Sequence, residues 1–120
     1  MTHIVVTLPI KIESTANKRW HWRARAAHAC VQRVEGRMAF MGRAYAPDPP
    51  LTVTMTRIAP RELDSDNLAI SFKHVRDGIA DWLGVNDNDK RVTWKYAQER
   101  GAPKHYAARV EIKADAMVAA

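Results

Sequence analysis

Two short acidic motifs are the residues of this 120-residue chain whose types and spacing could carry out chemistry. The first reads DSDN at 64–67, where Asp64 and Asp66 stand two residues apart. In an extended chain such residues point to the same side, so both carboxylates can face one ion. The second motif, NDND at 86–89, could return to the same place and add a third carboxylate. Clustered hard oxygen ligands suit Mg²⁺ or Mn²⁺, which leave coordination positions open for water and a substrate phosphate.

Each motif also has a purely structural interpretation. Asp66 could cap the helix that follows it, and residues 86–89 could form a polar turn, since Asn and Asp favour such turns. An EF-hand is excluded, because a loop that begins at Asp87 lacks the glycine at position six and the glutamate at position twelve that this calcium site needs.

Lys73 could assist the acidic residues. It lies seven residues beyond Asp66, nearly two helical turns, so an unbroken helix would place both on about the same face. Asp77 lies one turn further and could pair with it. A lysine beside metal-bound carboxylates can stabilise the negative charge of a phosphodiester transition state. The alternative interpretation is an ordinary solvated lysine.

These side chains must be positioned by a small set of elements. The β-branched stretch 3–12 predicts a strand near a sheet edge or a bulge, because it contains Pro9. A long helix is expected from Ser14 or Asn17 to about Met41, and alternating apolar residues predict a strand from 51 to about 58. The proline-rich stretch 46–50 between them should be a surface connection.

The second half of the chain shows the clearest helix. Apolar residues spaced four, three, four and three apart form one stripe between Asp66 and Gly84, namely Leu68, Phe72, Val75, Ile79 and Trp82. Residues 91–98 and 106–113 predict two strands joined as an antiparallel hairpin, with a disordered tail over 114–120. We therefore predict a single α+β domain over 1–120, with a mixed sheet and two main helices.

Charge is distributed unevenly along the chain. The formal net charge is +6, yet eight basic residues lie between Lys11 and Arg43, and seven of the thirteen acidic residues lie within 62–89. The basic segment interleaves cations with Trp20 and Trp22, which could stack on bases or sugars. A solvated helix face with packed tryptophans is the alternative. The predicted DNA-binding residues are Lys18, Arg19, Arg23 and Arg25.

Cysteine and apolar content suggest where the protein acts. Cys30 is the single cysteine, so an internal disulfide is impossible, and the apolar run 4–6 is far too short for a signal peptide or a membrane span. We therefore expect a cytoplasmic protein in a reducing compartment, with no membrane association.

The order of these motifs resembles the RusA-type Holliday junction resolvases, small endonucleases of bacteria, phages and prophages. The resemblance rests on LDSDNL at 63–68, KHVRDGI at 73–79 and GVNDNDKRV at 84–92, and the opening strand with its basic stretch also fits. It covers most of the chain, from about Ile4 to Ile112. The resemblance implies a RusA-like fold, a homodimer, and a Mg²⁺-dependent (or Mn²⁺-dependent) endodeoxyribonuclease that resolves four-way junctions in DNA recombination and repair.

The resemblance also assigns roles to residues. Asp64 and Asp66 would be catalytic metal ligands, Asp89 the acid of the second motif, and Lys73 the catalytic lysine. Lys73 lies further beyond Asn67 than the family's lysine does, which implies a three-residue insertion. Asn88 replaces the first of two adjacent acids, so Asp87 is an alternative metal ligand to Asp89.

Two other functions remain open from the sequence. The first is a DNA-binding protein that retains the fold without cleaving. The second is a phosphodiesterase that acts on RNA or on a small molecule.

Overall fold

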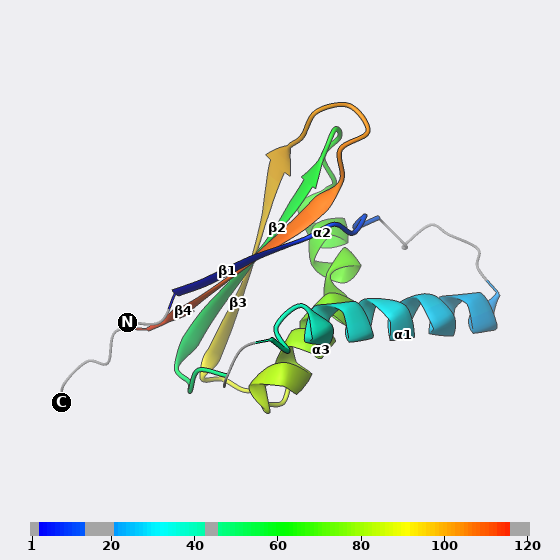
Figure 1. Cartoon of the computed structure of the whole chain (residues 1–120). Coiled ribbons are helices and arrows are strands. Elements are labelled where there is room, and N and C mark those ends of the chain that lie inside the picture. Colours follow the sequence, from blue (N-terminus) through cyan, green and yellow to red (C-terminus); the bar gives the residue numbers. More distant parts are fainter. Residues whose placement is uncertain (1–2, 14–20, 43–45, 116–120) are drawn as a thin grey trace.

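The computed structural model describes residues 3–13, 21–42 and 46–115. These residues form four strands and three helices, arranged as in Figure 1. The strands are β1 (His3–Leu8), β2 (Leu51–Ala59), β3 (Val92–Arg100) and β4 (Ala107–Ala114). The helices are α1 (Trp22–Met38), α2 (Ser65–Ser71) and α3 (Lys73–Leu83). The predicted α+β class is therefore confirmed, with three helices in place of two main ones.

The strands form one mixed sheet in the order β1-β4-β2-β3. β4 runs antiparallel to both β1 and β2, whereas β2 and β3 are parallel. A parallel pair needs a long crossover connection, and α2 and α3 provide it here. β1 is an edge strand, as the proline predicts, but it ends at Leu8 directly before Pro9 and not at residue 12.

One face of the sheet forms the hydrophobic core with the helices. Alternate residues of each strand point to this face because the side-chain period of a strand is two. Phe72, Val75 and Ile79 are fully buried against the sheet, as the apolar stripe predicts. The sheet residues of this cluster are Ile4, Leu8, Leu51, Val53, Met55, Val92, Ala108, Val110 and Ile112.

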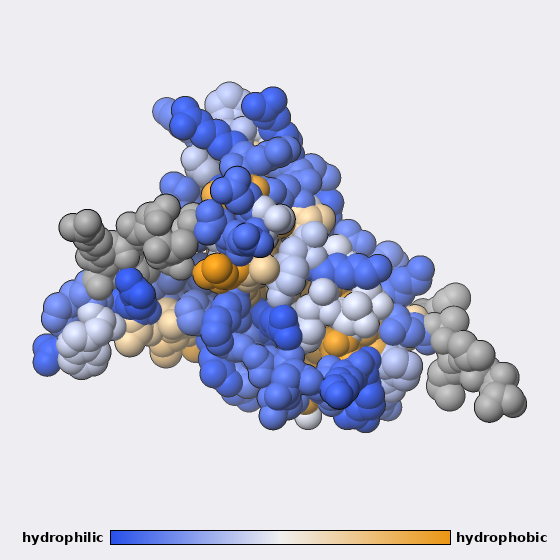
Figure 2. Space-filling view, turned by 180° about the vertical axis from the view of Figure 1, so that it is seen from behind, coloured by the Kyte–Doolittle hydropathy of each residue, from blue (hydrophilic) through white to orange (hydrophobic). Residues whose placement is uncertain are grey.

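The opposite face of the sheet is mainly polar. Arg109 on β4 forms ion pairs with Glu99 at 3.0 Å and with Glu111 at 3.3 Å. His3 Nε2 lies 3.7 Å from the same Glu111 carboxylate. Figure 2 shows another view in which hydrophilic residues dominate and hydrophobic residues surface in small separate areas.

α1 crosses α3 at two glycines that let the helix backbones touch. A Cβ atom added to Gly36 would lie 2.6 Å from the carbonyl oxygen of Val75, and one added to Gly78 would lie 2.0 Å from that of Arg33. Neither distance is possible for a real side chain, so this crossing requires glycine at both positions. Figure 1 shows that α1 extends from this crossing beyond the sheet.

The predicted hairpin of the last two strands is wrong. β2 lies between β3 and β4, and pairs with both. The connection 101–106 therefore crosses the end of β2, where the amide of Gly101 donates to the carbonyl oxygen of Ala59 at 2.9 Å. The local sequence resembles a turn, but the nonlocal parallel pairing of β3 with β2 prevails.

The predicted helix over 66–84 is two helices that meet at Phe72. The break follows Ser71, whose hydroxyl donates to the carbonyl oxygen of Asn67 at 2.5 Å, a contact that competes with the helical ladder and bends helices. Asp64, not Asp66, is the N-cap of α2, and its side chain makes no capping hydrogen bond. Gly84 ends α3 with a φ of 71°, as predicted.

The first long helix also begins later than predicted. α1 starts at Trp22, and His21 is its N-cap through a 3.2 Å contact between its ring nitrogen and the amide of Arg23. The predicted caps Ser14 and Asn17 lie outside the described residues. So do residues 116–120 of the predicted tail, whereas Ala114 ends β4 and the Thr52 hydroxyl bonds the Asp115 carboxylate at 2.6 Å.

No helix among the described residues is long and apolar enough to cross a membrane.

Candidate active-site cleft

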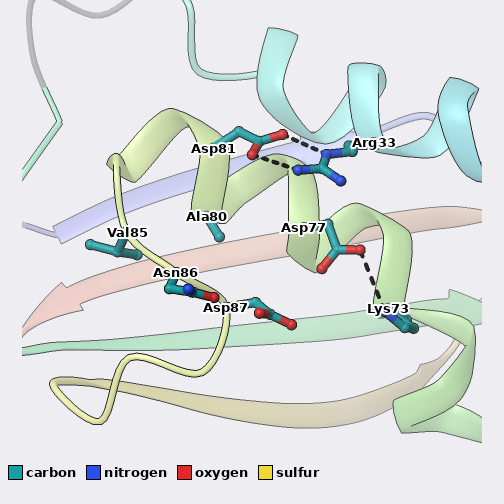
Figure 3. Close-up of a pocket in the computed structure, with 8 residues that line it drawn as sticks. All are labelled: Arg33, Lys73, Asp77, Ala80, Asp81, Val85, Asn86 and Asp87. Atoms are coloured by element: carbon teal, nitrogen blue, oxygen red, sulfur yellow. Dashed lines mark hydrogen bonds and ion pairs between the residues drawn. The ribbon is translucent and has the colours of Figure 1, made fainter.

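An open cleft of about 560 Å³ lies between α3, α1 and the loop that leads into β3. Figure 3 shows Lys73 and Asp77 on α3 facing Asn86 and Asp87 on the loop. Charged and polar side chains dominate the lining, which is formed by Arg33, Lys73, Asp77, Ala80, Asp81, Val85, Asn86 and Asp87. The second predicted motif is thus brought to α3.

The charged residues of α3 line the cleft because they recur every four residues. Lys73, Asp77 and Asp81 therefore share one helix face. Lys73 Nζ lies 3.7 Å from a carboxylate oxygen of Asp77, the pair that the sequence predicts. Lys73 itself remains largely exposed, so its ammonium group can also reach a bound anion.

Arg33 of α1 holds the third acid of this face. Its Nε and Nη2 donate to the two carboxylate oxygens of Asp81 at 2.7 and 2.8 Å, a bidentate arrangement. The hydrogen bonds to Arg33 lower the pKa of the Asp81 carboxyl, and those to Asp81 raise the pKa of Arg33. Asp81 is thus a helix-to-helix contact, whereas Asp77 lies beside Lys73 with its side chain only 15% exposed, and Asp87 comes from the loop on the other side of the cleft.

A second, smaller cleft of about 320 Å³ adjoins the first. Lys73 and Asp87 line both clefts, so the two adjoin, and we call them together the depression. The second cleft is more apolar, and its other lining residues are Ala69, Ile70, Arg76 and Tyr96.

Arg76 fixes the loop that carries Asp87. Its Nη2 donates to the carbonyl oxygen of Asp87 at 2.5 Å, and its Nη1 donates to the Tyr96 hydroxyl at 2.9 Å. The guanidinium carbon also lies 4.7 Å from the ring centroid of Trp94. One side chain of α3 therefore connects the loop to β3 and sets the position of Asp87.

Asp89, the preferred ligand of the second motif, is engaged by its own loop. Its two carboxylate oxygens accept from Nε and Nη2 of Arg91 at 3.1 and 2.8 Å, and one also accepts from the Arg91 amide at 2.9 Å. These hydrogen bonds lower the pKa of Asp89 to about 2. Asp89 does not line either cleft, so the geometry favours Asp87 of the two alternatives.

The first motif lies at the start of α2. Asp64 and Asp66 are both exposed, and neither lines the two clefts. Asp66 precedes Ala69 and Ile70 by three and four residues, which places it on the helix face that borders the second cleft. Within the ranges described, no three His, Cys, Asp or Glu side chains gather closely enough to hold a metal ion.

Of the predicted DNA contacts, Arg23 and Arg25 lie near the start of α1, the helix that also carries Arg33 of the cleft. Residues 21–27, including Arg23 and Arg25, are all exposed. The Arg23 guanidinium carbon lies 5.2 Å from the ring centroid of Trp22, whose own side chain is 67% exposed. Lys18 and Arg19 lie outside the described residues.

The sequence interpretation missed two residues of the cleft. In the sequence, Arg33 is one of the eight basic residues between Lys11 and Arg43. Nothing local links it to Asp81, which lies forty-eight residues away. Arg76 likewise carries no motif. The i, i+4 spacing of Lys73, Asp77 and Asp81 was a usable signal for a charged helix face.

Comparison with known protein families found no family model that matches the chain, and a search of curated proteins found no match either.

Proposed function

We propose that the protein is a metal-dependent endodeoxyribonuclease that hydrolyses phosphodiesters in branched DNA such as four-way junctions, as the resemblance to RusA-type resolvases implies. The observation that supports the proposal is the depression formed by the two adjoining clefts that share Lys73 and Asp87. It brings together the exposed ammonium group of Lys73, the carboxylates of Asp77 and Asp87, and the more apolar lining of the second cleft.

The donor set of the depression fits Mg²⁺ in the form in which phosphoryl enzymes use it. This ion takes one or two carboxylates and completes its coordination with water and substrate phosphate, without a cage of protein ligands. Asp77 and Asp87 line one cleft and would hold it there. Asp64 and Asp66 remain the ligands that the resemblance predicts. When bound, the ion would activate water and stabilise the leaving oxygen.

The protein's own residues have separate roles in this proposal. Lys73 provides an exposed ammonium group at the rim, which stabilises the negative charge that develops on the phosphodiester. Arg76 holds Asp87 in place through the loop backbone. Arg23 and Arg25 on the projecting part of α1 bind phosphates away from the cut site.

A second copy of the chain is the proposed protein partner, because resolving a four-way junction needs two related cuts. α1 exposes an apolar row of Val31, Val34 and Met38, spaced for one helix face and each about half exposed or more. An apolar groove of about 470 Å³ lies beside this row, between α1 and the end of β1. Pairing of two copies there would cover both.

We place this activity in the cytoplasm. Cys30 is exposed and makes no disulfide, and exposed free thiols persist in reducing compartments.

Strand cleavage of a synthetic four-way junction tests the proposed activity. The full chain should nick the junction in Mg²⁺ or Mn²⁺, and Asp87→Asn should lower the rate about 100-fold or more, since a metal ion supplies several kcal/mol of transition-state stabilisation. Asp48→Asn, in the exposed 46–50 connection, is the matched control and should cut normally. Asp66→Asn tests the ligand that the resemblance assigns.

Each outcome of this assay is decisive. If no strand is cut in either metal, the enzyme proposal is wrong; if Asp87→Asn cuts normally, the cleft is not the active site. Cleavage of linear DNA or RNA without preference for branches would instead identify a general phosphodiesterase.

A DNA-binding protein that does not cleave is the second candidate. It is favoured by the positions of Asp64 and Asp66, the ligands that the resemblance predicts, which line neither cleft. Salt-dependent junction binding without nicking would identify it, because phosphate contacts alone give that behaviour.

A further inference from the structure

A separate cleft of about 360 Å³ opens at the carboxyl end of β2, where the chain leads into α2. It contains both positive and negative side chains, and it is lined by Lys11, Glu13, Arg57, Pro60, Arg61, Glu62, Leu63 and Tyr106. None of these residues belongs to the depression described above.

Arg57 is the unusual member of this cleft because it is a buried cation. Its side chain lies on the core face of β2, and the residue is only 7% exposed. Nε donates to the carbonyl oxygen of Ile12 at 2.8 Å, and Nη1 donates to that of Arg61. Among the described residues, no carboxylate lies within ion-pairing distance of its guanidinium group.

This arrangement leaves the charge of Arg57 without an ion pair among the described residues. Two carbonyl oxygens satisfy hydrogen bonds but carry no formal charge, and Glu13 of the same cleft acts on Arg57 only through space while it pairs with Lys11. Burial lowers the pKa of Arg57, and the charge of Glu13 opposes this change. An anion in the cleft would add negative charge beside the guanidinium group, which matches phosphate well.

The rim of the cleft is cationic once its internal ion pair is taken into account. Lys11 Nζ lies 2.9 Å from a carboxylate oxygen of Glu13, so these two charges offset each other in the net charge of the cleft, but the half-exposed ammonium group keeps further donors for an anion. Lys11 also lies 4.5 Å from the ring centroid of Tyr106, which fixes it at the rim. Arg57 and Arg61 then face the single carboxylate of Glu62, and the cleft keeps a net positive charge.

The loop that forms one wall is held firmly. The Gln98 side chain on β3 accepts from the amide of Leu63 and donates to its carbonyl oxygen, both at 2.7 Å. Leu63 directly precedes Asp64, so the cleft and the first acidic motif share one fixed segment.

We propose that this cleft binds a phosphate group of the DNA backbone through Arg57, Arg61 and Lys11, and so seats the strand beside the acidic motif. The backbone assignment rests on the proposed function, whereas binding of phosphate itself does not.

Titration with inorganic phosphate tests the cleft directly. We expect saturable NMR shifts of the Arg57 Nε–H and of the amides of residues 11–13 and 61–63. The double variant Lys11→Gln/Arg61→Gln should weaken binding about tenfold, since one hydrogen bond to a charged group contributes about that factor. Arg57→Lys keeps the charge but loses the fork, and should also weaken binding. The rim residues are exposed, so the double variant avoids the folding risk of changing Arg57.

The matched control is Lys95→Gln together with Lys113→Gln, which removes the same charge from exposed positions on β3 and β4. Equal phosphate affinity in the rim variant and in this control would show that the cleft is not the phosphate site. So would shifts that do not saturate.

A short DNA duplex separates the two sources of phosphate. If the duplex shifts the same resonances, the site binds the backbone; if only inorganic phosphate does, the assignment to DNA is wrong. Failure of the proposed function gives a different result, namely phosphate and duplex binding at the cleft with no junction cleavage.

Discussion

At the scale of single residues, neighbouring acids of the second motif have opposite roles. Asp89 is held by three hydrogen bonds from Arg91, and its carboxylate stabilises the turn that precedes β3. Asp87 lines both parts of the depression. The sequence could locate the motif but could not choose between the two acids, because the choice depends on where Arg91 and Arg76 point.

The pairing of Asp89 with Arg91 predicts a measurable titration. Arg91→Gln should raise the pKa of Asp89 from about 2 toward its ordinary value of 3.8, because the cation that stabilises the carboxylate is gone. The pKa of Asp89 is measured from its carboxyl-carbon NMR shift between about pH 1.5 and about pH 5, a range that brackets both values. Lys90→Gln, at the exposed neighbouring position, is the control and should leave this pKa close to 2.

The sign of the linked stability effect is fixed. The folded pKa lies below the unfolded one, so the pair stabilises the fold above about pH 3.8, and this contribution is lost as the pH falls to about 2. Denaturation of wild type and Arg91→Gln should therefore differ near neutral pH and converge in acid. A difference that grows in acid would contradict this origin.

At the scale of elements, α1 and α3 can pack closely because Gly36 and Gly78 lie at their crossing. The loop before β3 is held against α3 by Arg76. Strands and the apolar stripe of α3 could be predicted from the sequence, because both follow local periodicity. The insertion of β2 between β3 and β4 could not, since it depends on contacts between distant segments. Nor could the break at Phe72, because the apolar stripe runs through it without interruption and the contact of Ser71 with Asn67 leaves no mark on that periodicity. Asp66 and Lys73 therefore lie on two different helices and do not share one helix face.

Gly78→Ala should destabilise the protein by about 1–3 kcal/mol, because its new methyl group would meet backbone and force the helices apart. Replacing glycine by alanine also raises helix propensity by about 1 kcal/mol, which does not offset a destabilisation in the upper part of this range. Urea denaturation measures the change. Gly42→Ala is the control, because no atom lies within 4 Å of its added Cβ. Equal stability of both variants would show that the helices do not touch as described.

Arg76→Met should loosen the loop before β3. The methionine keeps the bulk of the side chain but loses the donors to Asp87 and Tyr96. Backbone amides of 84–91 should exchange with solvent faster, while those of the central strand β2 stay protected. Arg76→Lys should restore little, since one ammonium group cannot span both acceptors while covering Trp94. Unchanged exchange in both variants would show that the loop holds its position without Arg76.

At the scale of the whole molecule, charge and apolar surface are separated. Cations lie on the projecting part of α1, acids gather at the cleft, and an apolar row lies on the outer side of α1. The sequence predicted the uneven charge, since eight basic residues lie between Lys11 and Arg43 and seven acidic residues lie within 62–89. The apolar row could not be recognised in the sequence, because the same residues would equally suit a buried helix face.

Met38→Glu should convert the proposed dimer to a monomer, because a charge in the apolar row would be desolvated on association. Light scattering coupled to size exclusion measures the mass. Met41→Glu is the matched control, since Met41 is also exposed but lies beyond the end of α1 and outside the apolar row. A wild-type chain that runs as a monomer at high concentration would contradict this interface.

The strand order has a consequence for how the chain is made. β1 pairs with β4, so that His3 lies opposite Lys113, and β4 lies between β1 and β2 in the sheet. During synthesis the first strand therefore emerges long before its partner, and the sheet closes only after nearly all the described residues have left the ribosome. Such nonlocal pairing slows folding, because loop closure precedes the contacts that reward it. Until then both edges of β1 are unpaired, which makes the nascent chain the state most exposed to aggregation.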